Sequence, residues 1–408
     1  MKVLLVNKFH YIKSGSERVY FDTKKVLEDK GHEVICFSMQ DERNLPSDQS
    51  EFFVPNVDFS NTKGWFKKSL RFLYYPEAAR RLEKLIEQEK PDVAHLHNIY
   101  HQLTYSILKP LRKHKIPIVH TLHDYQVIAP NYHLYSHGSI DETCKKRKYY
   151  RCVFRKCVRA AFLPSLLATL EAYLNWFMGF TKKVDLYISP SNFLITKFRE
   201  WGFKPKMKVI NNFVHCDEFV PEYTSGDYLL YFGRISNEKG IMTLVQAIRK
   251  LPDVKLKIVG MGPQKEMIQS YLKKKQIKNV ELLGPRYGDD LFNIVKKARM
   301  VVSPSRWFEN YPMSILEAMA LGKPILASDI GGQTEMVTTG YNGWLVKPSS
   351  IVELRGQIRR VYNDVHLIEQ YGRNARRTVE QKNCAEVYAR QIIETYNQVL
   401  GKKNLDLG

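Results

Sequence analysis

Residues 228–250 read YLLYFGRISNEKGIMTLVQAIRK, and they set the architecture of the second half of the chain. The apolar run from Tyr228 to Phe232 predicts a buried strand, and the apolar spacing from Ile241 to Lys250 predicts a helix. A short glycine-bearing loop joins the two. Strand, loop and helix in this order are typical of a parallel α/β sheet, because parallel strands need long crossover connections.

The same alternation continues outward in both directions. Downstream, short apolar runs predict strands at 255–259, 280–283, 300–302, 324–327 and 343–346. Upstream, they predict strands at 2–7, 33–38, 92–97, 116–121 and 184–189, with a helix at 16–30. We therefore expect an α/β protein with two doubly wound, Rossmann-like domains that face each other across a cleft.

A joint rich in Pro, Gly and Ser at 219–227 separates the two halves. We assign residues 1–215 to an N-terminal domain, which carries a basic and apolar insertion at about 133–180. Residues 216–382 form the C-terminal domain. Residues 383–408 are expected to form a helix that packs back toward the N-terminal domain.

Composition limits the classes of partner. The chain has 408 residues, 63 Lys and Arg against 42 Asp and Glu, a net charge of +21, and 44% hydrophobic residues, which excludes disorder as its main state. Nucleic acid, phosphorylated small molecules and an acidic membrane would all attract this charge. The basic residues are spread along the chain, with no helix-turn-helix, RNP or zinc-finger pattern, so no nucleic acid partner is expected.

Cysteine usage indicates a reducing compartment. Six cysteines are few for this length, and the N-terminus lacks the apolar core of a signal peptide, so we expect free buried thiols and a cytoplasmic location. Cys144, Cys152 and Cys157 leave one alternative open. With His133 or His137 they would complete a tetrahedral zinc site, although no close Cys pair is present.

Residues 160–180, AAFLPSLLATLEAYLNWFMGF, are mostly apolar. Pro164, Glu171 and Asn175 argue against a membrane span, because a central carboxylate is costly in bilayer hydrocarbon. A basic run from Lys145 to Arg159 precedes the segment and suits anionic headgroups. The segment either lies in a membrane interface or forms a buried helical hairpin beside a solvated basic loop.

The loop Gly233 to Gly240 follows a predicted strand, where ligands bind in open parallel sheets. Its glycines allow close backbone approach, while Arg234 and Lys239 provide a bidentate and a point-charge partner for phosphate. By itself such a loop is a weak signal.

Residues 303–322, SPSRWFENYPMSILEAMALG, carry more information. Pro312 suits the first turn of a helix that ends near Gly322, so Glu309 and Asn310 lie at its N-terminal end, where free N–H groups favour phosphate. Glu317 lies one to two turns inside an otherwise apolar helix. Its carboxylate would accept hydrogen bonds from two neighbouring sugar hydroxyls or form a structural salt bridge.

Together these residues resemble a known family. Glu309 and Glu317, seven residues apart, follow Gly-Arg-x4-Lys-Gly and precede GKPILASDIGG, an arrangement similar to the retaining glycosyltransferases of family 4, group 1 type. Further similar motifs are Ser14-Gly15-Ser16-Glu17-Arg18, His95-Leu96-His97-Asn98, His123-Asp124-Tyr125, Pro190-Ser191-Asn192 and Ile210-Asn211-Asn212. Ser16 replaces a glycine of the family pattern. The resemblance covers nearly the whole chain and implies the two-domain GT-B fold.

The resemblance also implies a donor site. Arg234 and Lys239 would bind the diphosphate of a UDP-sugar or GDP-sugar and stabilise the leaving group, so that no metal or other cofactor is required. Glu309 would hold hydroxyls of the donor sugar and Glu317 those of the ribose. The implied donor-binding residues are Gly15, Ser16, Gly233, Arg234, Lys239, Glu309, Asn310, Tyr311, Pro312, Met313 and Glu317.

By the same resemblance, His123 would face the anomeric centre and, with Glu309, Arg234 and Lys239, act in catalysis. Retention without a second carboxylate fits a front-face displacement, and Asp124 is the nearest carboxylate that could act as a nucleophile instead. His97, Asn98 and Asp124 would lie on the acceptor side.

The implied activity is transfer of a hexose to a lipid-linked or oligosaccharide acceptor during cell-surface polysaccharide synthesis. The implied setting is the inner face of the plasma membrane, with peripheral contact to its anionic surface. Two rivals with a GT-B fold remain, a nucleotide-sugar epimerase and a phosphorylase. The base, the sugar, the acceptor and the oligomeric state do not follow from the sequence.

Overall fold

The computed structural model describes residues 1–56, 65–224 and 226–401, with side chains described from residue 69 in the helix that opens the second range. These residues form two compact units. The first comprises Met1–His137, Asp141–Ile210 and the chain from Tyr388 onward, and the second comprises Gly138–Ile140 and Asn211–Val387. The predicted joint at 219–227 includes residue 225, and the predicted C-terminal segment includes residues 402–408; these positions lie outside the described residues.

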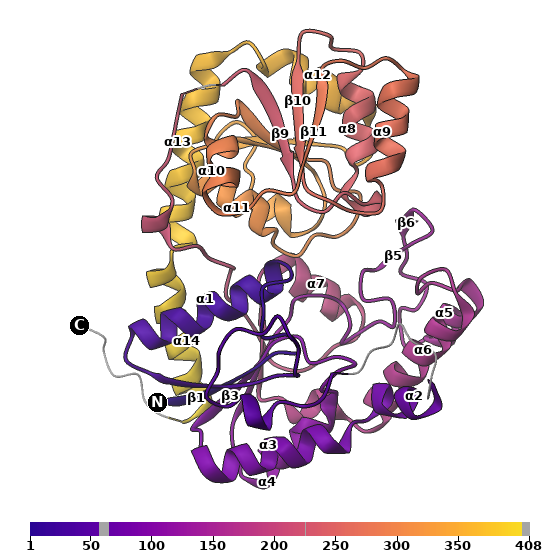
Figure 1. Cartoon of the computed structure of the whole chain (residues 1–408), viewed down its shortest axis with the longest axis vertical. Helices are drawn as coiled ribbons and strands as arrows, with labels where there is room; N and C mark the ends of the chain where they lie inside the picture. The colour runs from indigo at the N-terminus through magenta and orange to yellow at the C-terminus, as the bar shows by residue number, and fades with distance from the viewer. Residues whose placement is uncertain (57–64, 225, 402–408) are drawn as a thin grey trace. The chain divides into compact units, whose positions relative to one another are not determined.

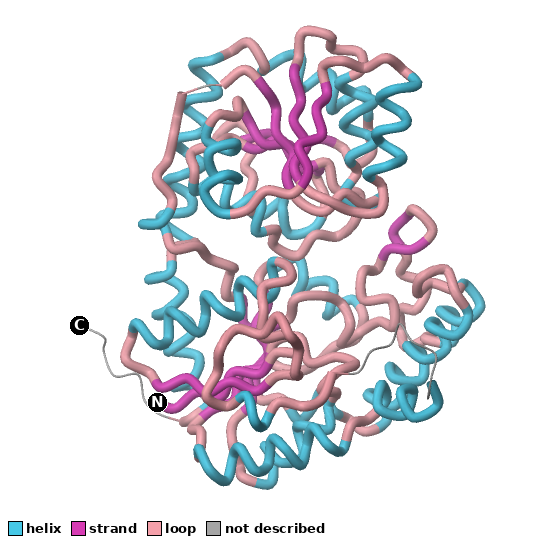
Figure 2. The backbone as a smooth tube through the Cα atoms, viewed as in Figure 1, coloured by secondary structure: helices cyan, strands magenta, loops and turns pink. Residues whose placement is uncertain are grey.

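The first unit is built on a six-stranded parallel sheet in the order β2-β1-β3-β4-β7-β8. Figure 1 labels β1 and β3 of this sheet, and Figure 2 draws the strands in magenta. Its strands are β1 (Lys2–Val6), β2 (Glu33–Phe37), β3 (Val93–Leu96), β4 (Ile118–Thr121), β7 (Leu186–Ser189) and β8 (Met207–Val209). Residues Val3 to Val6 are completely buried, because helices cover both faces of a parallel sheet. This explains why the first strand is a continuous apolar run rather than an alternating one.

Helices of the first unit follow its strands in the order expected for a doubly wound fold. They are α1 (Gly15–Asp29), α2 (Trp65–Leu73), α3 (Pro76–Glu89), α4 (Leu108–Lys113), α5 (Tyr150–Arg155), α6 (Phe162–Phe177) and α7 (Asn192–Glu200). Two short strands, β5 (Tyr135–Ser136) and β6 (Ser139–Ile140), lie between α4 and α5 in the sequence. In the described part of the chain, no helix has the length and apolar composition needed to cross a membrane.

The second unit has its own six-stranded parallel sheet, in the order β11-β10-β9-β12-β13-β14. The strands are β9 (Tyr228–Phe232), β10 (Lys255–Val259), β11 (Val280–Gly284), β12 (Met300–Ser303), β13 (Ile325–Ser328) and β14 (Gly343–Val346). The helices are α8 (Ile241–Ile248), α9 (Lys265–Lys274), α10 (Gly288–Lys296), α11 (Met313–Ala320), α12 (Ile351–Val361) and α13 (Val365–Lys382).

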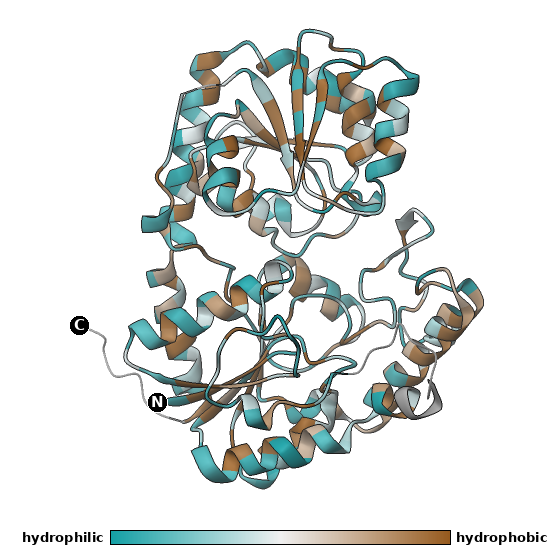
Figure 3. Ribbon diagram, viewed as in Figure 1, coloured by the Kyte–Doolittle hydropathy of each residue, from teal (hydrophilic) through white to brown (hydrophobic). Residues whose placement is uncertain are grey.

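Strand β9 shows how this sheet is held. Leu229 and Tyr231 belong to one hydrophobic cluster, whereas Tyr228, Leu230 and Phe232 belong to another. Successive side chains of a strand point to opposite faces, so the strand is buried from both sides. Figure 3 shows the resulting hydropathy pattern, with apolar strands inside and hydrophilic outer faces on the surrounding helices.

Both sheets change direction between two neighbouring strands, and these places position the loops of interest. In the first unit β1 lies beside β3, and in the second unit β9 lies beside β12, with the chain continuing to opposite sides from each pair. Loops diverge at such a switch point and leave a crevice beyond the strand ends, where ligands bind in open α/β sheets.

Helix α14 (Ala385–Val399) returns the chain to the first unit. The hydroxyl of Tyr388 lies 2.9 Å from that of Thr23 in α1, and the hydroxyl of Tyr396 lies 2.7 Å from Nδ1 of His95 in β3. Lys208 of β8 donates to Thr395 at 3.1 Å. The last helix is therefore anchored to the buried interior of a unit whose other residues end at Ile210, before the segment Asn211–Val387 of the second unit.

The expectation of free thiols is wrong for four of the six cysteines. Cys152 is disulfide-bonded to Cys157 and Cys216 to Cys384, while Cys36 and Cys144 are free and buried. The second bridge joins residues 168 positions apart, a pairing that follows from the path of the chain and has no signature in local spacing.

Candidate active site

In the second unit, the loops after β9 and β12 bring two predicted residues into contact. The ammonium of Lys239 lies 2.7 Å from Oε1 of Glu309, and the hydroxyl of Ser305 donates to the same oxygen at 2.6 Å. Glu309 is buried, with 6% of its side chain exposed, whereas 23% of the Lys239 side chain remains exposed. A charged pair therefore lies at the switch point, with the carboxylate inside and the cation reaching solvent.

The electrostatics keep Glu309 ionised. Burial raises the pKa of its carboxyl group, but the charge of Lys239 and hydrogen bonds from Lys239, Ser305 and Trp307 outweigh burial, so the net pKa lies below its usual value. Lys239 also lies 5.5 Å from the centre of the Trp307 ring. This carboxylate is thus a permanent hydrogen-bond acceptor at neutral pH.

Two glycines allow the loops to approach so closely. Gly240 has a φ of +71°, and a Cβ there would overlap the carbonyl oxygen of Pro304, which begins the loop after β12. Gly331 has a φ of +69°, and a Cβ there would lie 2.6 Å from the backbone N and O of Glu309. Only glycine fits both the left-handed conformation and the space. The GKPILASDIGG stretch thus contributes backbone packing against Glu309.

Helix α11 starts beside this pair. Pro312 is its N-cap and Met313 its first residue, so the predicted start is off by one position. Asn310 lies just before the helix, and Glu317 lies one turn inside and is buried. Pro312 has no N–H, and the free N–H groups of the first turn, with the helix dipole, favour an anion near Met313.

Tyr311 has a structural role for its side chain. Its hydroxyl accepts from Asn383 at 3.0 Å, its carbonyl oxygen accepts from Asn212 at 2.9 Å, and burial raises the pKa of its phenol to about 12. Whatever Tyr311 offers to a ligand must therefore come from its backbone. The predicted Arg234 is exposed, and its carbonyl oxygen accepts from the hydroxyl of Tyr231 at 2.7 Å.

The turn Gly260-Met261-Gly262, which follows β10, was not among the predicted site residues. A Cβ on Gly260 would overlap the carbonyl oxygen of Gly233, and one on Gly262 would overlap that of Ile235. Both glycines have positive φ, of 137° and 157°. Two glycines directly after a predicted strand were the available signal. The backbone of this turn therefore packs directly against the backbone of the loop that begins at Gly233.

In the first unit, the strand ends of β3 and β4 bring His97 and His123 together. His97 Nδ1 lies 2.9 Å from His123 Nε2, and the two rings stack with centres 5.2 Å apart. His95 lies 4.4 Å from His97 by ring centres, and His120 Nε2 lies 2.9 Å from the carbonyl oxygen of His97. His95 and His120 were not predicted as site residues. His95 lies two positions before the predicted His97, and His120 lies three positions before the predicted His123.

These histidines are neutral at physiological pH. Burial lowers the pKa of His95 and His123 to about 3 and that of His120 to about 4, and burial also lowers the pKa of His97 well below its usual value. One ring nitrogen of each neutral imidazole donates and the other accepts. The His97–His123 contact can therefore be satisfied without charge.

Asp124 and Asn98 lie at the same edge of the sheet, just after β4 and β3. Burial raises the pKa of Asp124, whose carboxylate accepts from the backbone N–H of Gln126 at 2.9 Å. The backbone N–H of Asn98 donates to Asn7 at 3.0 Å, and its carbonyl oxygen accepts from the N–H of Lys8 at 2.7 Å. Burial lowers the pKa of Lys8, and attraction to Asp124 and Glu17 opposes this shift. Lys8 thus lies at this edge with its amine buried near two carboxylates, and it was not among the predicted site residues.

Gly15 and Ser16 open α1, after the strand β1. The hydroxyl of Ser14 donates to Glu17 at 2.6 Å and that of Ser16 donates to Glu17 at 3.1 Å, so the buried Glu17 holds both hydroxyls at the helix start. His101 lies apart from the histidine group. It stacks on Phe72, with ring centres 4.1 Å apart, and its Nδ1 lies 3.2 Å from Glu171 of α6.

The structure groups the predicted residues by unit. Gly233, Arg234, Lys239, Glu309, Asn310, Tyr311, Pro312, Met313 and Glu317 belong to the second unit, and Gly15, Ser16, His97, Asn98, His123 and Asp124 to the first. The sulfur atoms of Cys144, Cys152 and Cys157 lie within 4.8 Å of one another. Because a disulfide occupies two of the three, they do not form a zinc ligand set in this structure.

The chain is similar in sequence to proteins of known families. Residues 13–218 match the family described as "Glycosyltransferase Family 4", and residues 217–378 match "Glycosyl transferases group 1". A protein of Klebsiella pneumoniae, named as an uncharacterized 42.6 kDa protein in the cps region, is 26% identical over 91% of this chain and 98% of its own length. An uncharacterized glycosyltransferase of Methanocaldococcus jannaschii is 30% identical, and the match covers 48% of this chain and 55% of the relative.

Solved structures share the fold. The Anabaena protein HepE, in complex with UDP and glucose, has a TM-score of 0.68 at 20% identity and covers 97% of this chain and 99% of its own. Sucrose-phosphate synthase of Thermosynechococcus elongatus has a TM-score of 0.72 at 18% identity, covering 98% and 99%. With matches of the two halves of the chain to the two domains of one enzyme class, the chain belongs to the family 4, group 1 glycosyltransferases, and it is a glycosyltransferase with the GT-B fold.

Proposed function

We propose that this enzyme transfers a hexose, with retention of configuration, from a UDP-sugar or GDP-sugar to a saccharide acceptor, without a metal. The contact that carries the proposal is the 2.7 Å pair of Lys239 and Glu309 at the switch point of the second unit. A nucleotide sugar is the class of ligand that offers both members a new partner at once.

The two members would exchange partners when the donor binds. The diphosphate attracts Lys239, which already reaches solvent, and the sugar hydroxyls donate to the buried, ionised Glu309. Glu309 remains satisfied before and after binding, so the exchange leaves no buried charge unpaired. Arg234, exposed on the same loop, provides the second cation, and the start of α11 provides N–H donors.

The reaction we propose is a front-face displacement. The bond from the anomeric carbon to the diphosphate oxygen breaks, the bond to the acceptor oxygen forms on the same face, and the departing phosphate oxygen takes the acceptor proton. Arg234 and Lys239 stabilise the negative charge that develops on the diphosphate, the task that a metal performs in other transferases. Glu317 holds the ribose hydroxyls.

The first unit would contribute the acceptor side and the region near the anomeric carbon. His123, neutral because burial lowers its pKa to about 3, adds no positive charge beside the positively polarised carbon. Its ring is held by His97 at 2.9 Å, so its orientation is fixed before substrate arrives. His97, Asn98 and Asp124 would receive the acceptor, and Gly15 and Ser16 would approach the donor phosphates through the first turn of α1.

The names of similar proteins support a substrate class. HepE was solved with UDP-glucose, so a UDP-sugar is the first donor to test. One relative is named as a lipopolysaccharide 1,2-N-acetylglucosaminetransferase of Salmonella typhimurium, 36% identical over 33% of this chain and 39% of its own length. These names support an acceptor used in cell-surface polysaccharide synthesis. We propose that this acceptor is lipid-linked and presented at the inner face of the plasma membrane.

Ligand-induced stabilisation tests the donor site. A panel of UDP, GDP, ADP and their common sugars, with EDTA present, should raise the melting temperature for one nucleotide, since a ligand that binds only the folded state stabilises it. Lys239→Ala and Glu317→Gln should lose the shift. Lys274→Ala, an exposed lysine at the end of α9, should keep it and serves as the matched control.

Two outcomes would overturn the proposal. A folded wild-type protein that responds to none of these nucleotides, or folded Lys239→Ala and Glu317→Gln variants that keep the full response and turnover, would remove the donor assignment. Product analysis completes the test. Release of an epimerised nucleotide sugar without any acceptor would instead identify an epimerase, and a need for added metal would refute the metal-free mechanism.

A further inference from the structure

Helix α6 and the segment before it form an unusually one-sided surface of the first unit. Between Glu142 and Asp185 the chain has ten Lys and Arg residues and one acidic residue, Glu171. Glu171 is buried, where it accepts from Gln126 at 3.0 Å and lies 3.2 Å from His101. The solvent-facing side of this segment therefore presents cations and no carboxylate.

The same segment exposes large apolar side chains. Phe154 of α5 and Phe177 of α6 are each 82% exposed, and Trp176 is 48% exposed. Phe162, Leu163, Leu170 and Met178 are also exposed, whereas Ser165, Ala168, Thr169 and Glu171 form the buried side of α6. The helix thus turns its small and polar residues inward and its largest apolar residues outward, the reverse of an ordinary surface helix.

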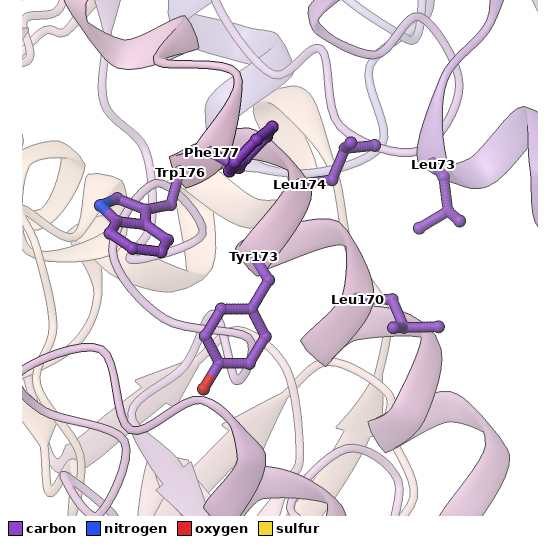
Figure 4. A pocket seen from close by; sticks show the side chains of 6 residues that line it. All are labelled: Leu73, Leu170, Tyr173, Leu174, Trp176 and Phe177. Carbon is purple, nitrogen blue, oxygen red and sulfur yellow. The ribbon is translucent and has the colours of Figure 1, made fainter.

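Leu73 at the end of α2 and five residues of α6 enclose an apolar groove of about 450 Å³ (Figure 4). The α6 residues are Leu170, Tyr173, Leu174, Trp176 and Phe177. A second groove of about 750 Å³ shares Leu73 and Leu174 with the first, so the two adjoin, and its lining also includes Arg71, Glu77 and Arg80. Concave apolar surfaces of this size hold small apolar ligands or chains.

The cations border the apolar surface directly. The guanidinium of Arg147 lies 5.0 Å from the centre of the Trp176 ring, and the hydroxyl of Tyr173 donates to the carbonyl oxygen of Arg147 at 3.2 Å. Lys146, Lys148 and Arg151 are exposed beside them. An indole with a cation next to it and hydrocarbon beyond is the arrangement found at the level of lipid headgroups.

We propose that this surface, from Lys145 to Met178 with Leu73, docks on an anionic lipid bilayer, with Phe154, Trp176 and Phe177 in the interface and a lipid chain in the groove. Charge selects this occupant. A second copy of the chain would bring the eight Lys and Arg residues of 145–178 against eight others. Lys145 and Arg155 are paired with Glu200 and Asp141, and anionic headgroups complement the remaining six cations. The inference deepens the proposed function, which requires access to a lipid-linked acceptor, but its test does not depend on sugar transfer.

Vesicle flotation with the full chain tests the surface. We expect binding to vesicles of phosphatidylcholine and phosphatidylglycerol in a three-to-one ratio, weak binding to phosphatidylcholine alone, and loss of binding at high salt. Trp176→Ser with Phe177→Ser should abolish flotation. Lys146→Ala, Lys148→Ala and Arg151→Ala together should weaken it by about fivefold per charge removed.

Matched controls distinguish binding through this surface from nonspecific binding caused by exposed apolar residues or by positive charge elsewhere. Val352→Ser removes an exposed apolar side chain from α12, and Lys273→Ala, Lys274→Ala and Lys275→Ala remove three exposed cations from the end of α9. Both controls should float as wild type does. Tryptophan fluorescence reports the position of Trp176 directly. Brominated lipid should quench the fluorescence of the wild type more than that of the Trp176→Phe variant.

The outcomes decide the proposal. Wild-type flotation of both surface variants, with folding intact, would overturn it. So would the absence of vesicle binding together with self-association that Phe177→Ser abolishes, because the surface would then join two copies. Nucleotide-induced stabilisation should remain unchanged in the surface variants, so failure of the membrane surface and failure of the donor site give different results.

Discussion

Lys239→Met should destabilise the second unit by more than any loss of an ordinary surface ion pair. At 2.7 Å from Glu309, the ammonium contributes a Coulomb attraction of about 6 kcal/mol at an effective dielectric constant of about 20. Desolvation of the pair offsets part of this gain. Removal of one partner from a buried pair costs about 3–5 kcal/mol, so we expect a loss of about 3 kcal/mol at pH 8, given the partial exposure of Lys239.

The sign of the pH dependence follows from the carboxylate. In the wild type the pKa of Glu309 is lowered, so its stabilisation is complete above the unfolded value of 4.5 and disappears only as pH falls through the folded value. In Lys239→Met, burial without the cation would raise this pKa, so protonation relieves the unpaired charge as pH falls. The cost of Lys239→Met should therefore shrink to less than half between pH 8 and pH 5.

The chain supplies a control pair with the same N–O distance. Lys255 and Asp227 also lie 2.7 Å apart in the second unit, but their side chains are 65% and 66% exposed. Lys255→Met should leave the free energy of unfolding nearly unchanged, because water screens an exposed pair. Adding Glu309→Gln to Lys239→Met completes a double-mutant cycle, in which we expect a coupling energy of about 2–3 kcal/mol.

Urea unfolding followed by hydrogen-exchange mass spectrometry gives the measurement. Peptides from residues 300–330 report the second unit separately, which matters because a two-unit chain need not unfold in a single transition. The reasoning fails if Lys239→Met costs no more than Lys255→Met. It also fails if the cost is the same at pH 5 and pH 8.

Three further predictions concern the two units. The pKa values of His95, His97, His120 and His123 lie below 6.5 in the folded state. The stability of the first unit should therefore decrease as pH falls below 6.5, by up to about 1.4 kcal/mol per pH unit for each ring. A urea midpoint that stays constant from pH 7 to pH 5 would contradict this. Cys384→Ser opens the bridge to Cys216 across 168 residues and should destabilise the second unit by about 4–5 kcal/mol in non-reducing urea titrations. If this bridge is responsible, dithiothreitol should cause the same loss of stability in the wild type and no further loss in the variant. Gly240→Ala should lower the melting temperature, because its Cβ would overlap the carbonyl oxygen of Pro304 and its φ is +71°. Gly356→Ala, in the interior of α12 where no atom lies near the new Cβ, should stabilise the protein by about 0.5–1 kcal/mol. Equal effects of the two substitutions would refute the steric argument.

Much of the fold was predictable because its strands are buried on both faces. The apolar run at Tyr228 to Phe232 coincides with β9, and that at 255–259 with β10. Strand β8, Met207–Val209, was missed because three residues with a central lysine carry no pattern. Sheet order has no local signature either, so the contact of β9 with β12, which unites Lys239 and Glu309, required the structure.

The candidate site shows the same division. The loops that bear Lys239 and Glu309 were selected because each follows a predicted strand, yet the direct ion pair between them was not expected. For residues 160–180 the sequence left an interfacial helix and a buried hairpin open. Burial of Glu171 on one side of α6 and exposure of Phe177 on the other depend on neighbours from distant parts of the chain. Disulfide partners are likewise set by the path of the chain.

The return of α14 to the first unit has a consequence for synthesis on the ribosome. Apart from residues 138–140, the second unit is continuous in sequence from Asn211 to Val387, so it can fold as soon as it emerges. The first unit emerges earlier but must wait for Tyr388 and Tyr396, whose hydroxyls meet Thr23 and His95. A nascent chain halted before Tyr388 would therefore expose the incomplete first unit to chaperones and proteases, while the second unit is already complete.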